Sequence, residues 1–480
     1  MPGRAGLGRS VAWAALEAAT HVGLSLVTLL IIARAIGPTA LGAAATAIAA
    51  IQLITLLVEA PLGEALIQRS QVSDVHFDTA LWSALALSLL LMGIVLVASL
   101  TLAPMEGYAE ILALLGVASL GVPFSAIAGI QSAMLRRDLQ FKQLAVRTLW
   151  ARSIGAATGL GLALTGAGAW SIVIQHLVTT IIGCVALCLS SRQRLGMKVE
   201  WAALFQLLRV SGPWLASEVL SVSQPRIFVL IVGGLLGVRE AGFLNIGFRL
   251  VETLREIIGH LSTNVSLPYF SRSQGDIVAL GSHFVSATTA LLVIAVPTFI
   301  GVAASAEVIV LTLVGPEWHP AVPLVQILAL GSSLSMFANF CTSIFTAIGR
   351  PGLAIPRGLV DLFFSTVVLI GTSGYGMTAV AATWAARQMA SGGLQLLLCS
   401  KVLSLGGLAL SGAAARSLAA AVVVGGTVLG VQLSLEDVIP LPALFTVLAV
   451  VGALVVPITA AIAYPPIAAG MRELVRSRQG

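Results

Sequence analysis

Charge is scarce in this sequence: only 10% of its 480 residues are Asp, Glu, Lys or Arg. A soluble domain carries about a quarter of such residues, so a water-soluble protein is excluded. Cysteine is also scarce, and the four cysteines lie inside apolar runs in no metal or disulfide motif, which favours small core residues. Long polar segments are missing too, which excludes a separate soluble catalytic module.

Apolar runs of membrane-spanning length dominate the rest of the chain. Hydrophobic residues make up 58% of it, with a mean hydropathy of +1.01, and many runs reach the roughly 20 residues that cross a bilayer as a helix. The sequence therefore predicts an all-α membrane protein of about fourteen transmembrane helices. The predicted spans are 11–33, 40–66, 78–103, 108–134, 142–165, 168–190, 206–237, 241–266, 281–305, 320–348, 354–373, 377–399, 410–431 and 438–464.

Basic residues are distributed very unevenly between the two sets of connecting loops. Sixteen lie in the tails and the loops of one side, whereas only Arg34 and Arg239 lie on the other. Cytoplasmic loops are enriched in Lys and Arg, so both termini are predicted to be cytoplasmic, in a bacterial inner membrane. Because these residues sit in short loops between spans, the net charge of +6 does not indicate a nucleic-acid partner.

A faint internal repeat divides the spans. The segment IGPTALG (36–42) follows the first span and LGVREAG (236–242) follows the seventh, so Gly37 and Gly42 recur as Gly237 and Gly242. Chance matching of glycine-rich loops is the alternative. A repeat predicts two six-helix lobes around a central cavity, as in many secondary transporters. The predicted divisions are 1–200 (spans 1–6), 201–403 (spans 7–12) and 404–480 (two additional spans and the tail).

Polar residues recur along one face of the span at 241–266. Spacings of three and four place side chains on a single helical face, here those of Asn245, Arg249, Glu252, Glu256, His260 and Asn264, with Arg255 beside them. Charges at membrane depth are costly and mark a cavity or each other. This face therefore predicts either the wall of a water-filled cavity or a neutralised Arg–Glu ladder that holds the lobes together. A shorter stripe in the first span contains Glu17 and His21.

Arginines in these spans are candidates for binding a phosphate-rich headgroup. A guanidinium stays charged at depth and its fork of donors matches phosphate oxygens. The candidates are Arg249, Arg226 and Arg255, which Glu252, Glu256 and Glu218 would hold in place in an empty site. His21 and His260 could titrate and couple transport to protons, or simply be hydrogen-bonded.

Other charged residues and prolines have plainer interpretations. Arg147, Arg152, Asp361 and Arg387 lie near predicted span ends, where we interpret them as reaching the headgroups. Prolines within spans, such as Pro123, Pro225 and Pro297, are expected to bend them. No phosphate-binding loop, HExxH motif or metal-ligand cluster is present. The sequence therefore predicts no metal, no cofactor and no ATP-driven pump.

Several segments in a fixed order resemble the bacterial polysaccharide-export flippases of the multidrug/oligosaccharidyl-lipid/polysaccharide exporter superfamily. They include ARAIGPTALGAAATAI (33–48), EAPLGEALIQR (59–69), QSAMLRRDLQFKQLAVRTLWAR (131–152), LGVREAGFLNIGFRLVETL (236–254) and VGPEWHPAVPLVQILAL (314–330). The resemblance covers roughly residues 10 to 400. It implies a twelve-helix core with two extra helices, and Arg249 matches a position that is often basic in this group.

The resemblance also implies a function. Such proteins translocate undecaprenyl-diphosphate-linked oligosaccharide repeat units for exopolysaccharide, capsule or O-antigen (lipopolysaccharide) biosynthesis, by alternating access. The implied partners are the lipid-linked oligosaccharide and membrane lipids, with the pathway's polymerase and glycosyltransferases as candidate protein partners. Two alternatives stay open: a cation-coupled multidrug antiporter of the same superfamily, and a membrane enzyme of polysaccharide assembly.

Overall fold

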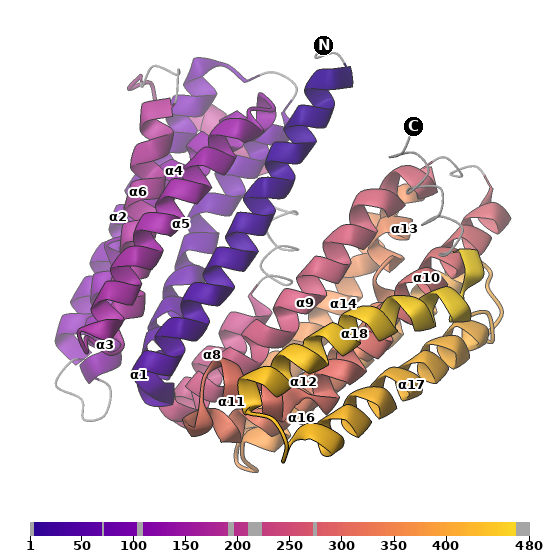
Figure 1. Ribbon diagram of the computed structural model, residues 1–480. Coiled ribbons are helices and arrows are strands. Elements are labelled where there is room, and N and C mark those ends of the chain that lie inside the picture. Colours follow the sequence, from indigo (N-terminus) through magenta and orange to yellow (C-terminus); the bar gives the residue numbers. More distant parts are fainter. Residues whose placement is uncertain are drawn as a thin grey trace. The chain divides into compact units, whose positions relative to one another are not determined.

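The chain is helical throughout the part that the structure describes. The computed structural model describes residues 4–69, 72–102, 109–190, 196–209, 223–271 and 276–466, without the side chains of 4–22, 60, 61, 68, 260–269, 271 and 351. No β-strand occurs in these ranges. The all-α class predicted from hydropathy is confirmed (Figure 1).

The helices follow one another with short connections. They are α1 (Arg4–Gln68), α2 (Asp74–Leu102), α3 (Ala109–Ser119), α4 (Val122–Arg137), α5 (Phe141–Leu164), α6 (Trp170–Ser190), α8 (Gln224–Leu235), α9 (Val238–Ser271), α10 (Ile277–Ala304), α11 (Ala306–Leu313), α12 (Val322–Ser335), α13 (Cys341–Ala347), α14 (Ile355–Phe363), α15 (Leu369–Ser373), α16 (Met377–Val402), α17 (Ser411–Leu435) and α18 (Leu441–Ala463). A π-helical turn, Phe364–Val368, joins α14 to α15.

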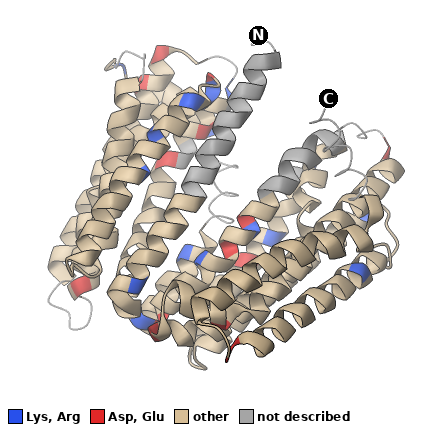
Figure 2. Cartoon of the chain, viewed as in Figure 1, with Lys and Arg blue, Asp and Glu red and all other residues tan. Residues whose placement is uncertain are grey.

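All fourteen predicted spans fall on helical segments, 206–237 being described only in part. Eight segments of the described chain are long and apolar enough to cross a membrane, or nine if α3 and α4, bent by 41°, form one span. The first of these segments contains two predicted spans, because α1 continues through a break at Gly37. The remaining predicted spans correspond to α5, α8, α9 and α16, of which α5, α9 and α16 carry charges within their length (Figure 2).

The chain forms two compact units, 1–245 and 246–480. In the first, α1 packs against α2 to α6 and α8 around a core that includes Ile51, Leu62 and Leu114. In the second, α10 packs against α12 and α17, and α16 packs against α12 and α14. The division observed falls within α9, whereas the predicted limits 1–200, 201–403 and 404–480 follow the spans and stay a prediction.

The repeated glycines meet in the first unit. Gly37 and Gly237 both have positive φ, 76° and 117°, a conformation that glycine adopts without steric cost. A Cβ on Gly42 would lie 1.6 Å from the carbonyl oxygen of Val238, and one on Gly242 would lie 2.1 Å from that of Pro38. The start of α9 therefore crosses α1 just after its break through a reciprocal backbone contact that leaves no room for a side chain.

Candidate functional site

The predicted polar face of α9 contributes to the site through its described part. Asn245 and Arg249 are half-buried, the Glu252 side chain is 16% exposed, and Glu256 is exposed. Helical spacing places them along one side of α9, which at 34 residues is about 50 Å long. The side chains of His260 and Asn264 lie outside the described residues, so their part in this face stays a prediction.

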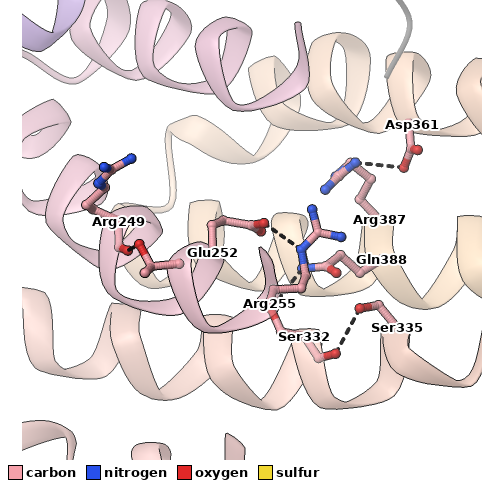
Figure 3. A network of polar contacts seen from close by, with 9 residues as sticks. Arg249, Glu252, Arg255, Ser332, Ser335, Asp361, Arg387 and Gln388 are labelled. Atoms are coloured by element: carbon pink, nitrogen blue, oxygen red, sulfur yellow. Dashed lines mark hydrogen bonds and ion pairs between the residues drawn. The ribbon is translucent and has the colours of Figure 1, made fainter. Parts of the chain in front are cut away.

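Glu252 and Arg255 form an ion pair on α9. Arg255 Nε donates to Glu252 Oε2 at 2.5 Å, and the Arg255 side chain is 35% exposed (Figure 3). The sequence predicted that Glu252 restrains an arginine of the site. The structure shows that Glu252 is ion-paired with Arg255.

A second ion pair joins α14 to α16. Arg387 Nη1 donates to Asp361 Oδ1 at 2.8 Å, and both side chains are under 10% exposed. Arg357 lies 3.6 Å from the other Asp361 oxygen and donates to Gln395 Oε1 at 2.7 Å. Asp361 thus accepts from one arginine and lies within ion-pair distance of a second, so a carboxylate that would be costly to bury alone is neutralised.

This second pair corrects one interpretation made from the sequence. Asp361 and Arg387 do not reach the headgroups: they are buried inside the second unit and bind each other. The reason is that two opposite charges at the same depth on neighbouring helices gain more from pairing than from stretching to the interface. A pattern in the sequence would have indicated this, since Arg387, Ser391 and Gln395 follow one another every four residues along α16.

Aromatic contacts connect the two ion pairs. The Arg387 guanidinium lies 3.8 Å from the ring centroid of Trp384, a cation–π contact. Trp384 in turn lies 4.4 Å, centroid to centroid, from Phe248 of α9. Arg387 also interacts electrostatically with Glu252, and Arg255 with Asp361. The charged side chains of α9, α14 and α16 therefore form one network, the α9–α16 network, which Gln388 extends to Ser332 of α12.

The network carries excess positive charge and unused hydrogen-bonding capacity. Four arginines (Arg249, Arg255, Arg357, Arg387) face two carboxylates (Glu252, Asp361), and counting the exposed Glu256 still leaves the arginines in excess. Within the described chain, Nε of Arg249, Nε of Arg387 and Oε1 of Glu252 are buried without a hydrogen-bond partner. Buried polar atoms are normally paired, so the network is suited to accept an anion.

An apolar cavity lies beside the network. It measures about 450 Å³ and is lined by α10, α11, α17 and α18, with residues such as Pro297, Val308, Val424 and Leu448. Leu254 of α9 also contributes to its wall, and in the sequence this residue stands between Glu252 and Arg255. One segment of α9 therefore supplies both charged side chains and a wall of an apolar space.

The other predicted site residues belong to the first unit or lie outside the described part. Arg226 on α8 donates through Nε to Gln52 Oε1 of α1 at 2.9 Å. Its grouping with Arg249 and Arg255 stays a prediction. Glu218 lies outside the described residues, and so do the side chains of Glu17 and His21.

Two further arginines of the first unit bind their own helices' neighbours. Arg152, which was interpreted as reaching the headgroups, donates to the hydroxyl of Ser25 in α1. Arg137 donates to the carbonyl of Leu66 at 2.7 Å, so it caps the end of α1. Among the described side chains, no group of three or more His, Cys, Asp and Glu residues could hold a metal ion.

Comparison with known proteins gives matches over most of the chain. Residues 31–323 match the family described as polysaccharide biosynthesis protein. The succinoglycan biosynthesis transport protein ExoT of Rhizobium meliloti (strain 1021) is 27% identical over 68% of this chain, which spans 66% of that protein, just under two thirds of its length. The lipopolysaccharide biosynthesis protein WzxC of Escherichia coli (strain K12) is 21% identical over 75% of this chain and 74% of its own.

Solved structures share the fold. The lipid II flippase MurJ in an inward closed conformation superposes with a TM-score of 0.75 at 15% identity, over 95% of this chain and 99% of that one. An inward-facing multidrug resistance transporter of the MATE family gives 0.59 at 14% identity, over 82% and 98%. At these identities the likeness shows the fold alone.

Proposed function

Because the chain belongs to the polysaccharide biosynthesis protein family, we propose that it is a flippase that moves lipid-linked oligosaccharide units across the bacterial inner membrane. The observation that carries this proposal is the α9–α16 network. It places four arginines within transmembrane helices of one unit, with too few carboxylates to neutralise them.

The chemistry of the network favours a diphosphate headgroup. Arginine binds phosphate oxygens through charge-assisted, often bidentate hydrogen bonds, and Arg249 Nε is a buried donor without a partner in the described chain. A sugar diphosphate could not cross hydrocarbon without such groups, because desolvated charge is very costly. Arg249 is therefore the first residue that we assign to the headgroup, with Arg255 beside it.

The apolar cavity suits the other end of such a molecule. Its walls are almost entirely aliphatic, contributed by α10, α11, α17 and α18, and Leu254 brings it next to the charged segment of α9. A polyprenyl chain would be bound there by apolar burial, while its headgroup contacts the arginines. The transported molecule is then a polyprenyl-diphosphate-linked oligosaccharide, moved by alternating access.

A cation-coupled multidrug antiporter is the second candidate, and the MATE-family likeness is an argument about fold only. Organic cations are bound by acidic and aromatic sites, whereas the α9–α16 network has more arginines than carboxylates. An enzyme of polysaccharide assembly is less well supported, since the described side chains form a charged network that binds rather than a site with a nucleophile and base. We therefore propose a transporter and not an enzyme.

Lipid analysis of a deletion strain tests the proposal. If the protein is the flippase, the deletion stops glycan export, and lipid-linked repeat units accumulate in the cytoplasmic leaflet. A plasmid copy of the gene restores both. Continued export without accumulation of these lipids would contradict the proposal, and accumulation of a lipid-linked precursor that lacks sugars would indicate an enzyme instead.

A further inference from the structure

Two buried atoms of the α9–α16 network are complementary but are not bonded to each other. Glu252 Oε1 is an acceptor and Arg387 Nε is a donor, and neither has a hydrogen-bond partner among the described residues. The two side chains already interact electrostatically. Leaving two such atoms unpaired in a low-dielectric interior is unfavourable, so something must prevent Glu252 from binding Arg387.

Arg255 is what holds Glu252 away. The Glu252 carboxylate accepts from Arg255 Nε at 2.5 Å, within the same helix. Moving Glu252 to Arg387 would leave Arg255 without its counter-ion. Arg255 is the more accessible of the two arginines, with 35% of its side chain exposed against 8% for Arg387. An anion that enters the site therefore reaches Arg255 and not Arg387.

We propose that Glu252 is an exchangeable counter-ion that binds Arg255 in the empty site and moves to Arg387 when a diphosphate binds Arg255. This inference rests on the proposed function and adds how the site responds to its ligand. Glu252 belongs to α9 and Arg387 to α16, so the exchange replaces a bond within one helix by a bond between two. Binding of the headgroup thereby tightens the packing of α9 against α16.

Trp384 is placed to report the exchange. It stacks on the Arg387 guanidinium and on Phe248 of α9, and it is 1% exposed. A new bond at Arg387 Nε changes the charge and position of the group that covers the indole ring (Figure 3 shows Arg387 between Asp361 and the Glu252–Arg255 pair). The emission of Trp384 is obtained by subtracting the spectrum of a Trp384→Phe protein.

The experiment uses the full chain in lipid nanodiscs, with undecaprenyl diphosphate as the probe and undecaprenol as the uncharged comparison. In the unmodified protein, undecaprenyl diphosphate binds and changes Trp384 emission, and undecaprenol does not. Glu252→Gln removes the competing charge at nearly constant volume, so we expect about tenfold tighter binding and no emission change. Arg387→Lys keeps the charge beside Asp361 but removes Nε, so it binds normally and also loses the emission change.

Glu436→Gln is the matched control, because it removes an exposed carboxylate between α17 and α18 and should behave like the unmodified protein. The exchange is overturned if Glu252→Gln binds no more tightly, or if the emission change persists in Arg387→Lys. Arg387→Lys decides the matter on its own if Glu252→Gln does not fold. Failure of the unmodified protein to bind undecaprenyl diphosphate would instead overturn the proposed function, and the exchange with it.

Discussion

At the scale of single residues, the charged side chains inside the membrane differ in how completely they are neutralised. Asp361 and Arg387 form a buried pair that Arg357 supports, while Arg249 has a buried Nε with no partner in the described chain. A buried pair is weak evidence for stability by itself, but removing one partner is costly. The Asp361–Arg387 pair is therefore structural, and Arg249 is the residue left for a ligand.

Asp361→Asn should destabilise the second unit, because it leaves the Arg387 guanidinium buried without a counter-ion. Loss of one partner of a buried pair costs about 3–5 kcal/mol, so the thermal unfolding midpoint in detergent should fall clearly. Glu307→Gln is the control, since the Glu307 side chain is 53% exposed and lies 3.7 Å from His319, and it should leave the midpoint unchanged. An Asp361→Asn protein as stable as the control would contradict a structural role.

The sequence predicted the α9 side of the network but only half of its chemistry. Spacing along 241–266 identified Arg249, Glu252 and Glu256, because one helix face can be read from periodicity. The partners on α14 and α16 could not be predicted, since pairing between helices depends on their relative rotation and depth. Position near a span end therefore misled the interpretation of Asp361 and Arg387.

At the scale of helices, hydropathy located the spans and glycine and proline determined where they break. Gly37 interrupts α1 with positive φ. Prolines expected to bend spans instead mostly begin helices: Pro123 and Pro225 stand in the first turns of α4 and α8, and Pro297 alone of these three lies inside a helix. The physical reason is that the first turn of a helix has no use for the missing N–H.

Gly42→Ala should disturb the crossing of α1 and α9, because the added methyl group would lie 1.6 Å from the Val238 carbonyl oxygen. Overpacking of a tight contact costs about 1–3 kcal/mol, so the unfolding midpoint should fall and transport should weaken. Gly23→Ala on the same helix is the matched control, since nothing lies within 4 Å of its added Cβ. Equal stability of the two variants would show that the crossing adapts freely.

At the scale of the whole molecule, the chain combines two compact units with a membrane orientation that charge alone predicts. Sixteen basic residues against two assign one side to the cytoplasm. The number and order of the helices followed from the sequence because each span must bury about the same length of apolar chain. The division after Asn245, inside α9, could not be predicted, since it depends on which helices pack together.

Reporter fusions test the orientation. A green fluorescent protein fused after residue 480 should fluoresce, and alkaline phosphatase fused there should be inactive, because both results require a cytoplasmic C-terminus. Alkaline phosphatase inserted in the segment 434–440, between α17 and α18, should be active. The reverse pattern would place the basic loops outside and contradict the predicted topology.

The central claim is that this protein moves a diphosphate-linked lipid by means of arginines on α9. The measurement that tests it most directly is translocation of an undecaprenyl-diphosphate-linked oligosaccharide in vesicles that contain only the purified protein, followed by access of the sugar to an external lectin. We predict transfer by the unmodified protein and its loss in Arg249→Ala, with Glu436→Gln as active as the unmodified protein. Transfer by Arg249→Ala at the unmodified rate, or no transfer by the unmodified protein, would contradict the account.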